Sequence, residues 1–315
     1  MLIVALTFCA NTSLFGQDRI LVRQVEFYHE NDALKFRKIT DQYYSFGLFL
    51  GFKSVLKEES KLARLTQKIG FLPREKVLLS NELFVKGFTP ERNKDGVDEP
   101  RRPFAGISGL KTTISISNST RIWTMGTFIG VRGKISGAEW VQYNFHQLIS
   151  SPIFEGWENQ LPNKFLFGIH GAFIKPFFNR KWFQAVSRSS LSLGNYQILL
   201  EEDLGVQIGL FNKPDRSSIF HNFIDRKTGN KPEYYVYASV FGRAIATDAT
   251  LALDSHNQKW LNPLDKRNLL AGYQIKFIFQ TGRVGGQMGY TRVSTESNLS
   301  SKHSYGTLGI TYSFR

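Results

Sequence analysis

The sequence predicts an all-β fold, a transmembrane antiparallel β-barrel of about 12 strands. Apolar and polar residues alternate with a period of two along much of the chain, and the chain is rich in Phe and Gly, with 27 of each. No continuous apolar stretch reaches the roughly 18 to 20 residues that a membrane helix needs. Mean hydropathy is slightly polar at −0.23, which a barrel tolerates because only alternate residues face lipid.

The first residues have the pattern of a secretory signal peptide. The apolar run from Leu2 to Ala10 is too short to span a bilayer, and Gly16–Gln17 is typical of a cleavage point, although the usual basic n-region is missing. We therefore expect a signal peptide over residues 1–16 and a barrel domain over 17–315, with a short buried strand as the alternative for the N-terminus. Cys9, the only cysteine, lies in this segment, so the mature chain is expected to have no disulfide or thiolate chemistry.

Many of the predicted strands have two chemically different faces. In residues 44–52, Tyr44, Phe46 and Leu50 are expected on one face, with Ser45 and Gly47 on the other. Because small and polar residues share one face in many strands, that face suits a lumen better than a packed core. The twelve predicted strands span residues 18–30, 43–55, 60–72, 105–118, 121–135, 164–178, 181–194, 200–212, 233–247, 267–280, 284–296 and 303–314.

The loop lengths indicate which end of the barrel faces outward. An even strand number places both termini on the periplasmic side. The long connections at 74–104, 136–163 and 248–266 then all become extracellular, as barrels prefer. The connection at 213–232 is long but falls on the periplasmic side, so either that loop is unusual or the strand count slips there.

Polar residues from scattered segments meet at the predicted extracellular rim. A histidine can take a proton from water near neutral pH. Asp32, with Glu30 or Asp41, offers hard oxygen ligands for a cation such as calcium, which can polarise an ester carbonyl. Arginines there could pair with phosphate or carboxylate groups. The residues at the rim are Asn31, Asp32, Ser45, Arg101, Arg102 and His146.

Each of these residues also has a simpler explanation. An Asn-Asp pair at a strand end is usually a turn, Ser45 could be a small lumen residue, and Arg101 and Arg102 could be solvated loop charges. Spacing alone therefore does not establish an enzyme.

The segments that carry these residues resemble, in order, the lipid A 3′-O-deacylases (the LpxR family). The resemblance covers roughly residues 25 to 165 and implies a twelve-stranded outer-membrane barrel. It also implies a calcium-dependent esterase that removes the 3′-linked acyloxyacyl group from lipid A. The matching segments are Glu30-Asn31-Asp32, Thr40-Asp41-Gln42-Tyr43-Tyr44-Ser45-Phe46-Gly47, Arg102-Pro103-Phe104-Ala105-Gly106, Val141-Gln142-Tyr143-Asn144-Phe145-His146 and Gly156-Trp157-Glu158-Asn159-Gln160-Leu161.

The resemblance also implies roles for single residues. His146 would be the general base that activates water, and Asn31 and Asp32 would have metal and oxyanion roles. Ser45 stands where the family usually has Thr and keeps the hydroxyl. Arg101 and Arg102 would hold acidic groups of the substrate.

One position departs from the family. The family places a catalytic glutamate shortly after the histidine, and Glu155 is the only carboxylate between Ser150 and Trp157. Its spacing from Trp157 is shifted, so Glu155 either takes the role through a rearranged loop or the role is lost.

The predicted partner is lipid A, or lipopolysaccharide, in the outer leaflet of the cell outer membrane, bound by a monomer. A formal net charge of +14 suits a surface surrounded by anionic headgroups, and nucleic acid is not an expected partner. Two alternatives remain: a non-catalytic barrel or pore, and an outer-membrane phospholipase that would also use calcium and a rim histidine.

Overall fold

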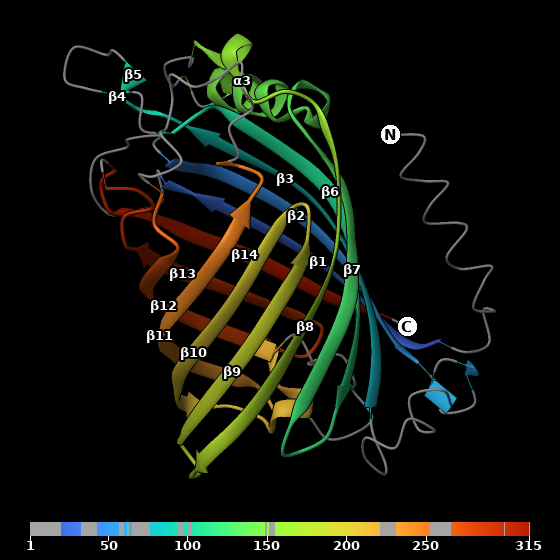
Figure 1. Cartoon of the computed structure of the whole chain (residues 1–315). Helices are drawn as coiled ribbons and strands as arrows, with labels where there is room; N and C mark the ends of the chain where they lie inside the picture. Colours follow the sequence, from blue (N-terminus) through green and yellow to red (C-terminus); the bar gives the residue numbers. More distant parts are fainter. Residues whose placement is uncertain are drawn as a thin grey trace.

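Twelve antiparallel strands close into a barrel in the computed structural model, with β1 pairing β14 (Figure 1). The structure describes residues 20–32, 43–56, 60–61, 63–64, 76–92, 98–99, 102–148, 150, 155–220, 231–251, 266–298 and 300–314. The predicted signal peptide over 1–16 and Cys9 lie outside these residues. The barrel strands are β1 (Ile20–Asn31), β2 (Tyr43–Leu56), β3 (Lys76–Thr89), β6 (Ala105–Ser117), β7 (Ile122–Arg132), β8 (Lys164–Asn179), β9 (Phe183–Gly194), β10 (Gln197–Leu210), β11 (Glu233–Asp248), β12 (Leu269–Thr281), β13 (Val284–Val293) and β14 (His303–Phe314).

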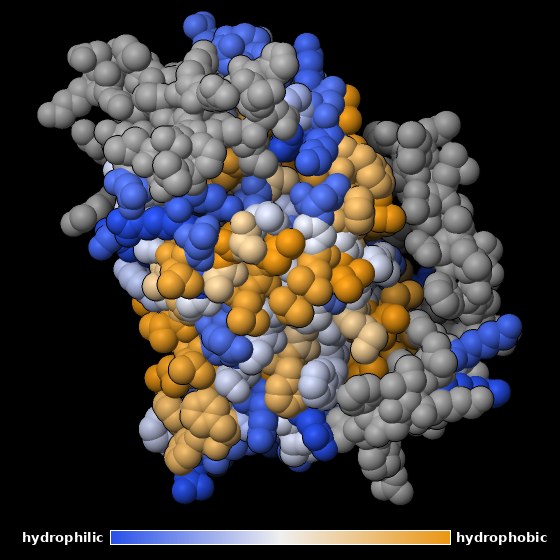
Figure 2. Space-filling model, viewed as in Figure 1, coloured by the Kyte–Doolittle hydropathy of each residue, from blue (hydrophilic) through white to orange (hydrophobic). Residues whose placement is uncertain are grey.

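The two faces of the wall have the chemistry that the alternation predicted. Ile129 and Ile310 point outward and are 54% and 56% exposed, whereas Arg132 and Thr307 point into the barrel and are buried. On the face drawn in Figure 2, hydrophobic side chains gather across the middle of the wall, with hydrophilic groups above them and at the lower edge. Within the described residues no helix has the length and apolar character to cross a bilayer.

The third strand was predicted in the wrong place. Of the predicted strand 60–72, the described residues form a helical turn in which the Arg64 amide donates to the Ser60 carbonyl (3.0 Å). The strand is instead β3, which the prediction had assigned to the long connection 74–104. Its alternation is blurred because Leu78 and Phe84 face the lumen, while Asn81 faces outward and accepts a hydrogen bond from Thr112 (2.9 Å).

A β-bulge in β2 corrects the predicted faces of that strand. The pairing with β3 skips Ser45, since Tyr44 lies opposite Phe88 and Phe46 lies opposite Gly87. The extra residue turns Tyr44 into the lumen, where its hydroxyl donates to Glu30 (2.5 Å). Phe46 therefore faces the opposite way from Tyr44, although the simple alternation placed them together.

The two ends of the barrel differ. The helix α3 (Ala138–Leu148) and the two-stranded hairpin of β4 (Glu91–Arg92) and β5 (Asp98–Glu99) lie at one end, labelled in the upper part of Figure 1. We call it the α3 end. Of the connections predicted to be extracellular, 136–163 and 248–266 begin at this end, as does the part of 74–104 that follows β3, because each follows an odd-numbered strand of the barrel.

The long connection 213–232 joins two consecutive barrel strands, so the predicted strand count is correct at this point and the loop itself is unusual. It connects β10 to β11 at the end opposite α3 and contains two 3-10 turns, η5 (Pro214–Arg216) and η6 (Ser218–Phe220). Ile219 packs against side chains of β11 and β12, whereas Phe220 packs against side chains of β7, β8 and β9. Ser218 reaches a small cavity beside β1. Because these contacts reach strands on opposite sides of the barrel, the segment 213–220 forms a floor to the lumen.

Candidate functional site

The candidate site lies on the outer side of the wall, under helix α3. Ala138, Gln142 and His146 recur every four residues and are the buried residues of the helix. This spacing places them on one face of the helix, which rests against β3 and β6. The sequence prediction had placed His146 in a long loop, and the structure shows that this part of the loop is helical.

A small pocket separates α3 from the first two strands. His29 and Asn31 line it from β1, Phe46 and Leu48 from β2, and His146 from α3. Its volume of about 20 Å³ has room for a single water molecule. The strand alternation fixes its position, because Asn31 points outward with His29 and Phe27, and Phe27 is 45% exposed in the lipid-facing surface.

A tryptophan fixes the helix over this pocket. The Trp157 indole N–H donates to the Gln142 side-chain oxygen (2.6 Å), one turn before His146. Trp157 also packs against Phe104, with ring centroids 5.3 Å apart, and against Phe46 in the same buried cluster. The η4 turn (Trp157–Asn159) that carries it follows Gly156, whose φ of 111° favours glycine. Four of the segments with a family resemblance therefore meet in one cluster.

Asn31 and Asp32 end β1 beside the pocket, and both side chains are buried. A buried carboxylate next to an amide oxygen is the donor chemistry that a hard cation such as calcium prefers. Among the described residues there is no group of three or more His, Cys, Asp or Glu arranged for a metal. Asp41, the third predicted ligand, lies outside the described residues. Asn31 and Asp32 therefore offer the oxygen atoms that calcium prefers, and they are the two predicted ligands that the described residues include.

Glu30 and Ser45 each form a hydrogen bond with another side chain. Glu30 is next to Asn31 in the chain but points into the lumen, where it accepts the Tyr44 hydrogen bond. Ser45 is fully buried in the bulge and shares a 2.6 Å hydrogen bond with the Thr89 hydroxyl. The bulge therefore holds the Ser45 hydroxyl near the end of β1 with a partner on β3, and its catalytic role stays a prediction.

Arg102 is buried at the α3 end of the lumen. Its guanidinium forms an ion pair with Glu296, donates to the Thr250 hydroxyl (2.7 Å) and lies 4.4 Å from the centre of the Phe88 ring. Burial by itself raises the pKa of the Glu296 carboxyl, but the adjacent Arg102 guanidinium outweighs that effect and holds the pKa below its ordinary value. Arg102 therefore joins three connecting segments, and substrate binding by it stays a prediction.

The remaining predicted residues do not join the pocket in the described structure. Glu155 is exposed in the segment before η4 and does not line the pocket. Arg101 lies outside the described residues. Of the predicted set, the structure thus brings Asn31 and His146 together in one pocket, with Asp32 adjacent in the chain.

Two pocket residues were missed from the sequence. Gln142 has a buried side-chain nitrogen that has no hydrogen-bond partner in the described part of the chain. It lies four residues before His146, so helical spacing could have revealed it. His29 lies two residues before Asn31 on the same strand face, 5.5 Å from the Phe145 ring. Strand alternation could have identified it.

The family model described as "Outer membrane protein LpxR" matches residues 1–314. Among solved structures, LpxR from Salmonella typhimurium is similar with a TM-score of 0.73 and 17% identity, over 92% of this chain and 99% of that chain. The KdgM porin aligns with a TM-score of 0.40 and 7% identity, over 93% of this chain and 99% of that chain. The β domain of the Bordetella autotransporter BrkA aligns with a TM-score of 0.43 and 7% identity, over 92% and 97% respectively.

No curated protein matches the sequence. The family model nevertheless spans nearly the whole chain, and the closed barrel of twelve strands places the protein in the outer membrane. On this evidence the chain belongs to the LpxR family of outer membrane proteins.

Proposed function

We propose that this protein is a lipid A 3′-O-deacylase, which hydrolyses the 3′-linked acyloxyacyl ester of lipid A in the outer leaflet. The observation that carries the proposal is the position of the pocket. His146 and Asn31 meet on the lipid-facing side of the wall, above outward apolar residues such as Phe27 and Leu50. A lipid in the leaflet can place its acyl chains along that surface and its ester beside the histidine.

In this proposal His146 takes a proton from a water molecule as the water oxygen attacks the ester carbonyl. The protonated imidazole then returns the proton to the leaving sugar oxygen, so the products are a free fatty acid and a sugar hydroxyl. The Gln142 side-chain nitrogen is a buried donor with no partner among the residues that the structure describes, and it can donate to the carbonyl oxygen as negative charge develops there. A calcium ion held by the Asn31 and Asp32 oxygens would add positive charge near the same oxygen.

The test is expression in Gram-negative cells with hexa-acylated lipid A, followed by mass spectrometry of the extracted lipid A. The unmodified protein is expected to remove the 3′ acyloxyacyl group, and His146→Ala to abolish the removal. Gln142→Leu should lower the rate by about 10²- to 10³-fold, the range for loss of one oxyanion donor. Gln147→Ala, an exposed substitution on the same helix, is the matched control and should remain active.

Unchanged lipid A with a folded barrel and calcium present would contradict the deacylase. Release of fatty acid from glycerophospholipids instead, with the same dependence on His146, would assign a phospholipase. If neither lipid is cleaved, the barrel-only alternative is favoured.

A further inference from the structure

The side of helix α3 that points away from the barrel is largely apolar. Trp140 is 70% exposed, Leu148 81% and Tyr143 45%. Ile135, in the turn η3 (Lys134–Ser136) just before the helix, is 59% exposed. We call these four residues the α3 surface. A helix that faces water normally exposes charged side chains, but none of the exposed residues of α3 carries a charge.

The exposed amide side chains of α3 are hydrogen-bonded within the helix itself. The Asn144 side-chain nitrogen donates to the Trp140 carbonyl (2.7 Å), and the Gln147 side-chain nitrogen donates to the Tyr143 hydroxyl (2.8 Å). A polar group that already has a partner costs less to remove from water than one without a partner. These two residues therefore suit a surface that is only partly in contact with water.

The helix has the same inside-out pattern as the barrel wall. Its polar residues Gln142 and His146 are buried toward the wall, while its large apolar residues point away from it. A helix of a water-soluble protein has the reverse pattern. In the strands, apolar Phe27 and Leu50 likewise point outward, 45% and 48% exposed, as lipid-facing residues do. The pattern of α3 indicates that its outward side meets the same apolar medium.

The α3 surface is continuous with the lipid-facing wall. Leu48 lines the pocket beneath the helix, and Leu50, two residues along the same strand, is exposed and pairs with Phe27. Two residues of a strand span about 7 Å, so the helix lies within one row of side chains of the exposed part of the wall. Because this wall belongs to an outer-membrane barrel, the medium that covers these rows is lipid.

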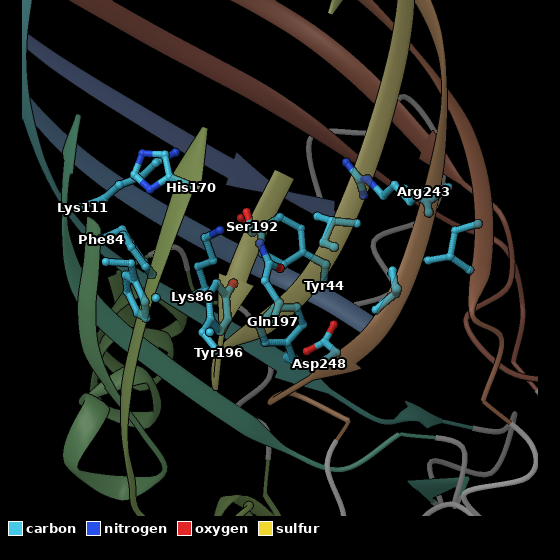
Figure 3. Close-up of a pocket in the computed structure, with 18 of the residues that line it drawn as sticks. Tyr44, Phe84, Lys86, Lys111, His170, Ser192, Tyr196, Gln197, Arg243 and Asp248 are labelled. Carbon is cyan, nitrogen blue, oxygen red and sulfur yellow. The ribbon is translucent and has the colours of Figure 1, made fainter. Parts of the chain in front are cut away.

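The lumen side of the wall carries charged groups instead. A larger cavity of about 320 Å³, the lumen cavity, lies there. Glu30 lines it, whereas Asn31, the next residue, lines the pocket beneath α3 on the other side of the wall. Figure 3 shows Lys86, Arg243 and Asp248 among the side chains that line the lumen cavity. The acyl chains of the leaflet therefore contact the outward side of the wall, which is also the side that carries α3.

We propose that the α3 surface is a membrane-contact surface, which lies at the boundary between the headgroups and the acyl chains of the surrounding outer leaflet. Trp140 and Tyr143 are of the residue types that favour this boundary, and an interfacial helix buries its apolar face about 5 to 10 Å into it. The contact also holds His146, on the opposite face of α3, at the depth of the lipid ester linkages. That consequence rests on the proposed function, whereas the contact itself does not.

The test attaches a bimane fluorophore at Leu148→Cys and measures what quenches it. The variant also carries Cys9→Ser, so that the label has a single site, and the protein is placed in phosphatidylcholine nanodiscs. Nitroxide at carbon 5 of the lipid acyl chain is expected to quench the label more than nitroxide at carbon 12 does, and iodide in the water at least about threefold less than at Ser119→Cys. Ser119, exposed in the turn between β6 and β7, is the aqueous control, and Ile310→Cys on the lipid-facing side of β14 is the lipid control.

Two results would overturn the proposal. Iodide quenching as strong at Leu148 as at Ser119 would place the α3 surface in water. A label that neither lipid nitroxide nor iodide reaches would mean that protein covers the surface, and a dimer in sedimentation would then identify a second copy as the cover. Should Leu148→Cys not fold, the same label at Trp140→Cys takes its place. Deacylation is not measured, so failure of the proposed function leaves this result unchanged.

Discussion

Replacement of Arg102 by methionine tests whether this arginine is a structural residue or a substrate ligand. The substitution keeps a long apolar side chain over Phe88 but leaves Glu296 without its cationic partner. The Arg102 side chain is 1% exposed and that of Glu296 16%. Removal of one partner of a buried pair typically costs about 3 to 5 kcal/mol, and the partial exposure of Glu296 places the expected loss near the lower value.

The assay is urea unfolding of the refolded barrel in detergent micelles, followed by tryptophan fluorescence. Arg102→Met combined with Glu296→Gln should cost less than the sum of the two single variants, because no unpaired charge remains. The loss of unfolding free energy caused by Arg102→Met should also be smaller at acid pH than at neutral pH. The folded-state pKa of Glu296 is depressed, so the pair stabilises the fold above the ordinary carboxyl pKa and loses this contribution as the pH falls through the folded value.

Two outcomes would refute this reasoning: a penalty below about 1 kcal/mol, or a penalty of the same size at neutral and acid pH. A substrate ligand has a different signature, since its loss raises KM and leaves the unfolding curve unchanged.

Three further predictions concern the wall, the lipid-facing surface and the floor. Gly106→Ala should lower deacylation while the barrel still folds, because the new Cβ would lie 2.2 Å from the Ser136 hydroxyl and displace the start of α3. The control is Gly242→Ala, whose Cβ has nothing within 4 Å, and equal deacylation rates in the two variants would contradict the prediction. Glu202→Leu should raise the free energy of unfolding in lipid vesicles by about 1 to 2 kcal/mol, since this carboxylate projects among lipid-facing leucines. Its hydrogen bond from the Ser189 hydroxyl (2.7 Å) is expected to be worth less than this gain, and a loss of stability would contradict that. The intact chain should give no steady channel in planar bilayers, and replacement of residues 213–220 by a short Gly-Ser turn should open one. Steady conductance by the intact chain would refute the inference that this segment closes the lumen.

Most of the barrel could be predicted because a lipid-facing wall imposes a two-residue period on the sequence. Eleven of the twelve predicted strands overlap the observed ones, from residues 18–30 against Ile20–Asn31 to an identical 303–314. The exception is β3, where apolar Phe84 faces the lumen and polar Asn81 faces outward, so the period is weak. The floor could not be predicted, because its contacts join residues far apart in the chain.

The site was predicted less completely than the fold. Motif order located Asn31 and His146, but the helical form of the loop was missed. The sequence of α3 is not simply amphipathic, because Trp140 and Leu148 are 70% and 81% exposed while polar Gln142 is buried. The usual helical pattern, with apolar residues on the buried face and polar residues on the exposed face, does not describe α3. The helix was therefore missed when the sequence was searched for that pattern.

The bulge at Ser45 relates the two cavities. Without the extra residue, Tyr44 and Phe46 would face the same side of β2, as period-two alternation requires. With it, Tyr44 enters the lumen and binds Glu30, while Phe46 turns outward beneath α3 and packs against Trp157. One irregular residue therefore supplies an aromatic side chain to each cavity. Ser45 is buried here and shares a hydrogen bond with the Thr89 hydroxyl, at a point where a regular strand would direct Tyr44 and Phe46 to the same side.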